Sequence, residues 1–218
     1  MSQLIFKFPF KISYFERDFF VSSNNFEAYK LIESWPKWPD KKLNIFGPSG
    51  CGKTHLINIL RKKLKLLCVD AEKFDENLSN IIENYDCVVI DNYLSNIDEK
   101  LFYSFINQII QMNKSIIVNS SMNLKSLKFN LKDLKSRLYS FLEIKIGLPT
   151  DDLIRVIILK TLSDKQVHLS NKNLEFIIKN IDRSYDKISK FVKDVDSLSL
   201  STGKSININL IKKVLKNE

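Results

Sequence analysis

The chain has 218 residues, of which 44% are hydrophobic, and a formal net charge of +9. This length allows one sizeable core and a small second domain, and no apolar run reaches the ~20 residues of a membrane helix. The lysines are scattered, and only Arg61-Lys62-Lys63 forms a compact run, so the charge predicts a solvated surface rather than a DNA site.

The three cysteines, Cys51, Cys68 and Cys87, lie in a glycine-rich turn and in two apolar runs. Their spacing fits neither a zinc site nor a disulfide framework, which favours a reducing compartment. The start of the chain, residues 1–10, lacks a small-residue cleavage site, so no signal peptide is expected. We therefore expect a cytoplasmic protein without a membrane partner.

Apolar runs typical of strands alternate with helical patterns through the first two thirds of the chain. Strands are predicted at 43–46, 66–69, 87–90, 115–118 and 142–146, and helices at 54–64 and 101–112. The run at 87–90 is wholly apolar, as expected of a strand buried on both faces. Strands separated by helices imply right-handed crossovers and a parallel sheet, so we predict an α/β fold.

The pattern changes at "GLPTDD", residues 147–152, after which only helices are predicted. Pro149 ends the last strand, and Thr150 can cap a helix whose first turn carries two aspartates. The predicted helices are 151–162, 171–181, 184–198 and 207–215. Ser170 is a plausible cap and Gly203 a breaker. A small all-helical domain is therefore expected after a boundary near Gly147.

A complete phosphate-loop motif, G-x-x-x-x-G-K-[ST], follows the first predicted strand. Its residues are Gly47, Pro48, Ser49, Gly50, Cys51, Gly52, Lys53 and Thr54. Glycines let backbone N–H groups turn toward phosphates, and the following helix adds its positive end. Lys53 would reach the β- and γ-phosphates, and the Thr54 hydroxyl would bind Mg²⁺.

An acid should end a buried strand beside this loop, and "CVVIDN" supplies Asp91 as a second Mg²⁺ ligand. The next residue, Asn92, cannot accept a proton at neutral pH. This position predicts a poor hydrolase, unless Asp98 or Glu99 takes over as the base.

Polar residues also follow the fourth strand. Asn119 is expected to face the phosphate loop and Asp91, where it could contact the γ-phosphate or a water molecule. Ser121 is the alternative, and a simple turn-forming role for Asn119 is equally compatible with the pattern.

These residues resemble the AAA+ ATPases, and among them the DnaA branch. The resemblance rests on "FFVSSNNFEAYKLIESWPKWP" at 19–39, "GKTHL" at 52–56 and "LKSRL" at 134–138. It implies a parallel sheet with helices on both faces, followed by a helical lid.

The same resemblance implies nucleotide contacts from Val21, Asn24 and His55. It also implies that Arg137 acts as an arginine finger on another subunit. An ion pair with Asp133 is the alternative role for Arg137.

Within that branch, "WPKWP" and "IDN" are similar to the Hda group, short DnaA homologues that inactivate DnaA, especially in its α-proteobacterial form. Because the predicted lid helices reach the end of the given sequence, the resemblance implies an expectation of a protein without the DNA-binding domain of DnaA. Its start resembles a peptide that binds the DNA sliding clamp, with the contacts Gln3, Leu4, Phe6 and Phe8; an edge strand is the alternative. The resemblance implies a clamp-binding segment at 1–10, a nucleotide-binding domain at 11–148 and a lid at 149–218.

The resemblance further implies ADP or ATP with Mg²⁺ as cofactors, and the sliding clamp and DnaA as partners. A homodimer is compatible with it, and sequence-specific DNA binding by this chain alone is not expected. In the lid, Asp186 stands where DnaA proteins carry a phosphate-binding arginine, and Arg183 and Lys187 flank it as replacements. Two rival functions are a self-sufficient ATPase of the helicase-loader type and a DNA-binding initiator fragment.

Overall fold

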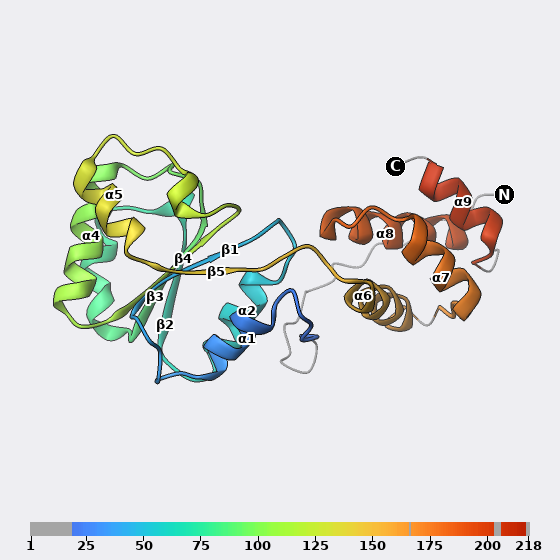
Figure 1. The fold of residues 1–218 in the computed structure, drawn as a ribbon, viewed down its shortest axis with the longest axis horizontal. Helices are drawn as coiled ribbons and strands as arrows, with labels where there is room; N and C mark the ends of the chain where they lie inside the picture. Colours follow the sequence, from blue (N-terminus) through green and yellow to red (C-terminus); the bar gives the residue numbers. More distant parts are fainter. Residues whose placement is uncertain (1–18, 166, 203–205, 217–218) are drawn as a thin grey trace. The chain divides into compact units, whose positions relative to one another are not determined.

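The computed structural model describes residues 19–165, 167–202 and 206–216 (Figure 1). The chain divides into two compact units, whose described parts lie within 14–147 and 148–218. The clamp-binding contacts predicted at residues 3–8 and the breaker predicted at Gly203 lie outside the described residues.

The first unit is built on one five-stranded parallel sheet. The strands are β1 (Lys42–Phe46), β2 (Leu66–Asp70), β3 (Cys87–Tyr93), β4 (Ser115–Ser120) and β5 (Leu142–Lys145), in the order β2-β3-β4-β1-β5. All neighbouring pairs are parallel, so the predicted parallel sheet is confirmed. β3 continues past the predicted run to Tyr93, which pairs with Ser120 of β4 after a register shift that follows Ile90.

Helices cover both faces of this sheet, as expected. They are α1 (Phe26–Glu33), α2 (Lys53–Leu60), α3 (Leu78–Ile81), α4 (Glu99–Gln111) and α5 (Lys132–Tyr139), with short 3₁₀ turns at Ala71–Lys73, Ile82–Asn84 and Leu124–Ser126. Figure 1 shows α4 and α5 on one face and α1 and α2 on the other. α2 ends at Leu60, before the predicted limit, because Arg61–Leu64 form a turn.

The core between the sheet and α4 explains why the central parts of β3 and β4 are apolar. Val88 and Ile90 of β3 pack with Phe102 and Phe105 of α4, and all four side chains are at most 1% exposed. Leu134 and Leu138 attach α5 to the same cluster. Their spacing of four residues places both on one helix face, which leaves the rest of α5 at the surface.

The polar side chain of Asn44 is fully buried inside the sheet. Its Nδ2 donates to the Val118 carbonyl and to Ser120 Oγ, each at 2.9 Å, and its Oδ1 accepts from the Leu124 backbone at 3.3 Å. The amide therefore connects β1 to the end of β4, where the candidate site lies.

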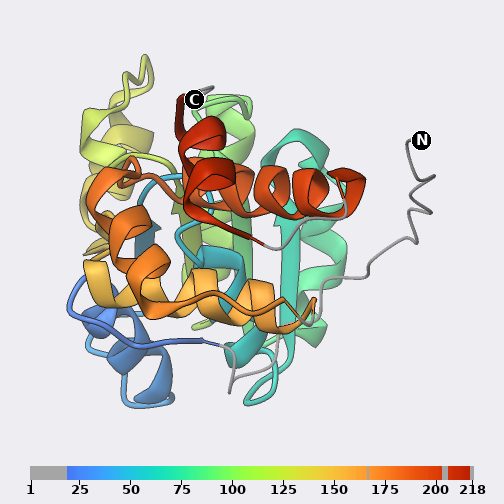
Figure 2. The same ribbon diagram turned by 90° about the vertical axis from the view of Figure 1, so that its right-hand side faces the viewer.

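The second unit contains the predicted helices, α6 (Asp151–Ser163), α7 (Asn171–Asn180), α8 (Tyr185–Thr202) and α9 (Ile208–Lys216), shown face on in Figure 2. Thr150 and Ser170 cap α6 and α7 by accepting from the Leu153 and Asn173 backbones, so both predicted caps are confirmed. α8 contacts α6 and α9, and their apolar faces form one core. No helix in the described ranges is both long and apolar enough to cross a membrane.

The change Asn44→Ala should destabilise the protein by about 2–4 kcal/mol, because it leaves buried polar groups of β4 and of the following turn without partners. Urea unfolding of both proteins measures the difference. Asn77→Ala, at an exposed position, is the control and should change the stability by less than about 0.5 kcal/mol. An Asn44→Ala protein as stable as the wild type would contradict this role.

Candidate nucleotide-binding site

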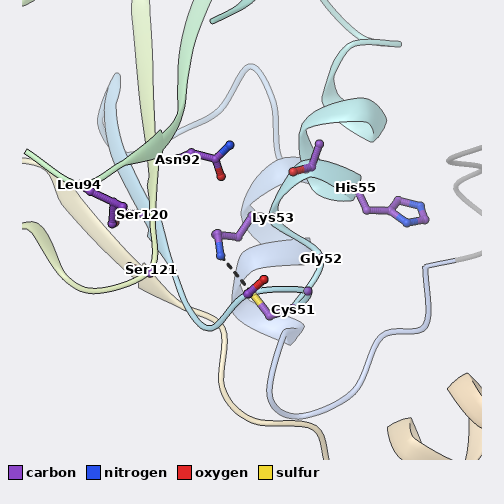
Figure 3. Close-up of a pocket in the computed structure, with 11 residues that line it drawn as sticks. Cys51, Gly52, Lys53, His55, Asn92, Leu94, Ser120 and Ser121 are labelled. Atoms are coloured by element: carbon purple, nitrogen blue, oxygen red, sulfur yellow. Dashed lines mark hydrogen bonds between the residues drawn. The ribbon is translucent and has the colours of Figure 1, made fainter. Parts of the chain in front are cut away.

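The carboxyl ends of β1, β3 and β4 meet at one edge of the sheet, which is where open α/β sheets bind ligands. A pocket of about 450 Å³ lies at this edge (Figure 3). Residues 49–55 of the phosphate loop line it, together with Asn92, Leu94, Ser120 and Ser121. The structure thus brings most of the predicted loop, His55 and the alternative residue Ser121 to one pocket.

The glycines of the loop are required by its backbone path. Gly50 and Gly52 have φ angles of 74° and 101°, which side-chain-bearing residues rarely adopt. A Cβ at Gly52 would also lie 3.0 Å from the Phe19 ring. Phe19 stacks on Tyr29 and contacts His55 edge-on, so an aromatic cluster supports the outer side of the loop.

The Lys53 ammonium is held at the loop itself. Its Nζ donates to the carbonyls of Gly47 and Pro48 at 2.7 and 3.0 Å. The charge therefore lies at the start of α2, where the helix dipole also favours an anion. This arrangement can bind phosphate oxygens.

Thr54 and Asp91, the two residues that the sequence predicts as Mg²⁺ ligands, are joined by a hydrogen bond, although only Thr54 lines the pocket. The Thr54 hydroxyl donates to Asp91 Oδ2 at 3.2 Å, and Asp91 Oδ1 accepts from Asn119 Nδ2 and from the Asn92 backbone, each at 3.1 Å. A hydroxyl and a carboxylate at this spacing are hard oxygen ligands that fit Mg²⁺. In the described ranges, no group of three or more His, Cys, Asp or Glu forms a separate metal site.

Asn119 is fully buried, and its Oδ1 has no hydrogen-bond partner among the described residues. A buried acceptor without a donor is unusual, and here it stands beside Asp91. The sequence-based expectation that Asn119 lies beside Asp91 agrees with this position, whereas a contact with γ-phosphate stays a prediction.

Asn92 points toward a residue that the sequence analysis overlooked. Its Nδ2 donates to Asp70 Oδ2, at the end of β2, over 2.7 Å. The hydrogen bond from Asn92 is the main cause that holds the pKa of the Asp70 carboxyl below its usual range. A hydrogen bond from the Glu72 backbone lowers it further. The signal was present in the sequence, because "LLCVD" is another apolar strand that ends in an acid.

The two acids considered as substitutes for Asn92 have other partners. Asp98 caps α4 by accepting from the Leu101 backbone at 2.9 Å. Glu99 accepts from the backbones of Asn130 and Leu131 at 3.0 and 2.5 Å, just before α5 begins. Neither acid lines the pocket at the phosphate loop.

Asn24 lies at the end of β5 rather than in the pocket lining. Its Nδ2 donates to the Gly147 carbonyl at 3.2 Å, and the Gly147 N–H donates back to the Asn24 carbonyl at 2.9 Å. Val21 is half-buried in the same segment. Nucleotide contacts of Val21 and Asn24 stay predictions, while Asn24 has a structural role that the sequence did not reveal.

Arg137 is exposed on α5, and its guanidinium has no ion-pair partner in the part of the chain that the structure describes. The alternative of a pair with Asp133 is therefore not realised. Glu99 anchors the chain just before this helix, so the arginine stands on a fixed element. Its action on another subunit stays a prediction.

Of the lid residues in the second unit, Arg183 lies just before α8 and Asp186 lies in its first turn. Arg183 pairs with Asp151 at 2.8 Å, and Asp186 is exposed in the first turn of the helix. Lys187 is half-buried. Phosphate contacts from Arg183 and Lys187 stay predictions.

The comparisons with known proteins fit this geometry. A family model described as RNA helicase matches residues 43–133, less than half of the chain. DnaA of Buchnera aphidicola subsp. Cinara cedri is 26% identical over 87% of this chain and 48% of its own length. DnaA of Borrelia turicatae is 29% identical over 96% of this chain and 54% of its own. The chain thus spans about half the length of the curated relatives it matches.

Solved structures show the same fold. Domain III of the Thermotoga maritima replication initiation protein DnaA has a TM-score of 0.77 at 22% identity and covers 96% of this chain and 98% of its own. A replication initiator DnaA bound to AMPPCP and single-stranded DNA has a TM-score of 0.70 at 20% identity, over 87% of this chain and 66% of its own.

The sheet order, the complete phosphate loop and the helical unit define a P-loop protein with the AAA+ fold. Within that class the chain is similar to DnaA: the curated relatives named above are DnaA proteins, and its fold matches DnaA domain III over almost the whole length of both chains.

Burial raises the pKa of all three cysteine thiols above the ordinary value of 9.0. The rise is largest for Cys87. For Cys51 the positive charge of Lys53 partly opposes it. A raised pKa leaves less reactive thiolate at pH 8 than the unfolded chain has. Alkylation of Cys51 and Cys68 should therefore be slower in the folded protein than in the unfolded chain. Above pH 9 the alkylation rate of the unfolded chain should level off, while that of the folded protein should still rise. Mass spectrometry of iodoacetamide-treated protein, with and without guanidinium, measures both. Equal rates at pH 8 would contradict the burial of these thiols.

Proposed function

We propose that the chain is a nucleotide-binding adaptor of the Hda kind, which holds ADP or ATP with Mg²⁺ and stimulates ATP hydrolysis by DnaA on a DNA-loaded sliding clamp. It would thereby limit the initiation of replication. The observation that carries the proposal is the exposed Arg137 on α5, in a chain with a complete phosphate loop but with Asn92 where a second acid would follow Asp91. The chain acts in the cytoplasm, at the nucleoid through the clamp.

The nucleotide part of the proposal rests on four groups at this end of the sheet. Backbone groups of the loop and the Lys53 ammonium would hold the phosphates, and Thr54 and Asp91 would hold the metal. Mg²⁺ in such a site neutralises phosphate charge. The solved DnaA bound to AMPPCP supports an adenine nucleotide as the ligand, and the acid at Asp186 favours ADP or weak ATP binding.

Arg137 carries the proposed activity on DnaA. A guanidinium brought to the γ-phosphate of another subunit stabilises charge in the transition state and is worth ~10³-fold or more in rate. The absence of an ion pair for Arg137 within the described residues leaves its fork open for such a contact. Its planar shape matches phosphate oxygens in a way that a lysine does not.

A self-sufficient ATPase of the helicase-loader type is the second candidate. The hydrogen bonds that join Thr54, Asp91 and Asn119 favour it, because they form a complete metal-side arrangement. Turnover by the isolated protein at ~1 s⁻¹ or above, in the usual enzyme range, would support that function over the adaptor.

The first eight residues should act as a detachable clamp ligand. Changing Gln3, Leu4 and Phe8 together to Ala should abolish binding to the sliding clamp in a pull-down and leave the melting temperature nearly unchanged, because the peptide would contribute its apolar side chains to a groove of the clamp. Lys7→Ala is the matched control and should still bind. Unfolding of the triple variant would instead assign these side chains to the core.

Arg137→Ala should leave folding, nucleotide binding and clamp binding intact but remove the stimulation of DnaA. Arg137→Lys should fail as well, because a point charge lacks the planar fork. The assay follows conversion of DnaA-bound ATP to ADP in the presence of DNA-loaded clamp. Lys135→Ala, at an exposed position of the same helix, is the control and should remain active. Full stimulation by Arg137→Ala would assign the activity to another residue.

A further inference from the structure

We propose that Glu99 is a positioning residue for the activity of Arg137 on its target. It is the first residue of α4, and its carboxylate fixes the start of α5, the helix that carries the arginine. The inference rests on the activity proposed above for Arg137 and goes beyond it, because it names the group that decides where the guanidinium is presented.

The start of α5 has no cap of its own. The residue before the helix is Leu131, whose side chain cannot accept a hydrogen bond, although Ser, Thr, Asp and Asn are preferred at this position. The Glu99 carboxylate supplies the acceptors from another helix. Its Oε1 accepts from the Asn130 backbone at 3.0 Å, and its Oε2 accepts from the Leu131 backbone at 2.5 Å. Because each oxygen has its own donor, the pair of bonds fixes direction as well as distance.

The same carboxylate is favoured by the amino ends of two helices. It belongs to the first turn of α4 and contacts the residues that lead into α5, and each of these ends carries a partial positive charge. Hydrogen bonds to an ionised acceptor are also about twice as strong as those between neutral groups. The connection between α4 and α5 therefore includes a strong polar contact in addition to their shared apolar core.

The position of Arg137 depends on this end of the helix. In the part of the chain that the structure describes, no ion pair holds its guanidinium, so the helix alone decides where it starts from. The Lys135 backbone donates to the Leu131 carbonyl at 3.0 Å, which joins the first turn of α5 to Leu131. Glu99 holds the N–H of this same leucine, and the arginine lies about two turns further on. A shift at Leu131 is therefore carried to Arg137.

The remaining anchors of α5 do not involve Glu99. Leu134 and Leu138 pack in the core, and Ser140 Oγ donates to the Arg137 carbonyl at 2.7 Å. Loss of the Glu99 contact should therefore leave α5 folded but able to tilt about these anchors. A misplacement of ~1 Å can cost a catalytic group ~10²-fold in rate, so a small tilt is sufficient to weaken the action of the arginine.

An open pocket at this contact allows the role of Glu99 to be tested in a folded protein. It has a volume of about 530 Å³, and Glu99, Asn130 and Leu131 are among the residues that line it. Water can enter such a space and replace a lost acceptor at the two backbone N–H groups. A change at Glu99 thus removes the fixed position of the α5 start without leaving buried polar groups unpaired.

The test compares Glu99→Gln with Asp98→Ala in the full chain. Glutamine keeps the length of the side chain, but one of its two terminal groups only donates and cannot accept from a backbone N–H. Asp98 is the matched control, because it caps the same end of α4 through the Leu101 backbone and does not contact the start of α5. Glu99→Ala, Arg137→Ala and the double variant Glu99→Gln/Arg137→Ala complete the set.

Two measurements are made on each variant. Conversion of DnaA-bound ATP to ADP on DNA-loaded clamp is followed against the concentration of this chain, which separates the maximal rate from the half-saturating concentration. Amide hydrogen exchange over α5 is measured on the isolated chain, and it reports local opening of this helix independently of any partner.

We expect Glu99→Gln to lower the maximal rate about three- to thirtyfold and to leave the half-saturating concentration within about twofold, because Glu99 acts on the arginine and not on docking. Asp98→Ala should keep the maximal rate within about twofold. The double variant should be no slower than Arg137→Ala. Exchange over α5 should be faster in Glu99→Gln than in the wild type and unchanged there in Asp98→Ala.

The inference is overturned if both Glu99 variants stimulate as the wild type does, if only the half-saturating concentration changes, or if Asp98→Ala loses as much activity. Unchanged exchange over α5 in Glu99→Gln overturns it as well. A wild type that gives no stimulation rejects the proposed function and this role with it. Stimulation that is lost in Arg137→Ala but kept in the Glu99 variants rejects the inference alone, so the two failures are distinguishable.

Discussion

The Asp91 carboxylate receives hydrogen bonds from three separate elements, and the rest of the candidate site depends on that meeting. Thr54 comes from α2, Asn119 from β4, and the Asn92 backbone from β3 itself. Such a carboxylate is satisfied only if the helix and both strands keep their relative positions. The parallel sheet provides this because its strands end at one edge, so the packing behind β3 and β4 also holds the polar groups in place.

Local signals in the sequence were sufficient for much of this arrangement. The phosphate loop has a fixed spacing and a backbone that needs glycine at 50 and 52, so the motif predicted its place before α2. A fully apolar run followed by Asp91 identified β3 and the acid that lies beside Thr54. Thr150 and Ser170 could be recognised as caps because capping depends on residues only three positions apart.

The parts that could not be predicted depend on side chains that meet across long stretches of sequence. The Asp70–Asn92 bond joins two strand ends, and its existence depends on a register shift that no periodicity reveals. Asn24 resembled a nucleotide contact, but its amide bonds to Gly147, more than a hundred residues away in the sequence. Glu99 was considered as a substitute base, but it begins α4, and its carboxylate bonds to the backbone that precedes α5.

The position of Glu99 changes how related sequences should be compared. Its carboxylate holds the two backbone N–H groups at Asn130 and Leu131, and the helix that presents Arg137 starts directly afterwards. A relative that retains the arginine but has lost this acid would present it from a less firmly tethered helix. Surveys of natural variation should therefore score the acid and the arginine as one inherited pair, because the arginine alone does not record whether its support is still present.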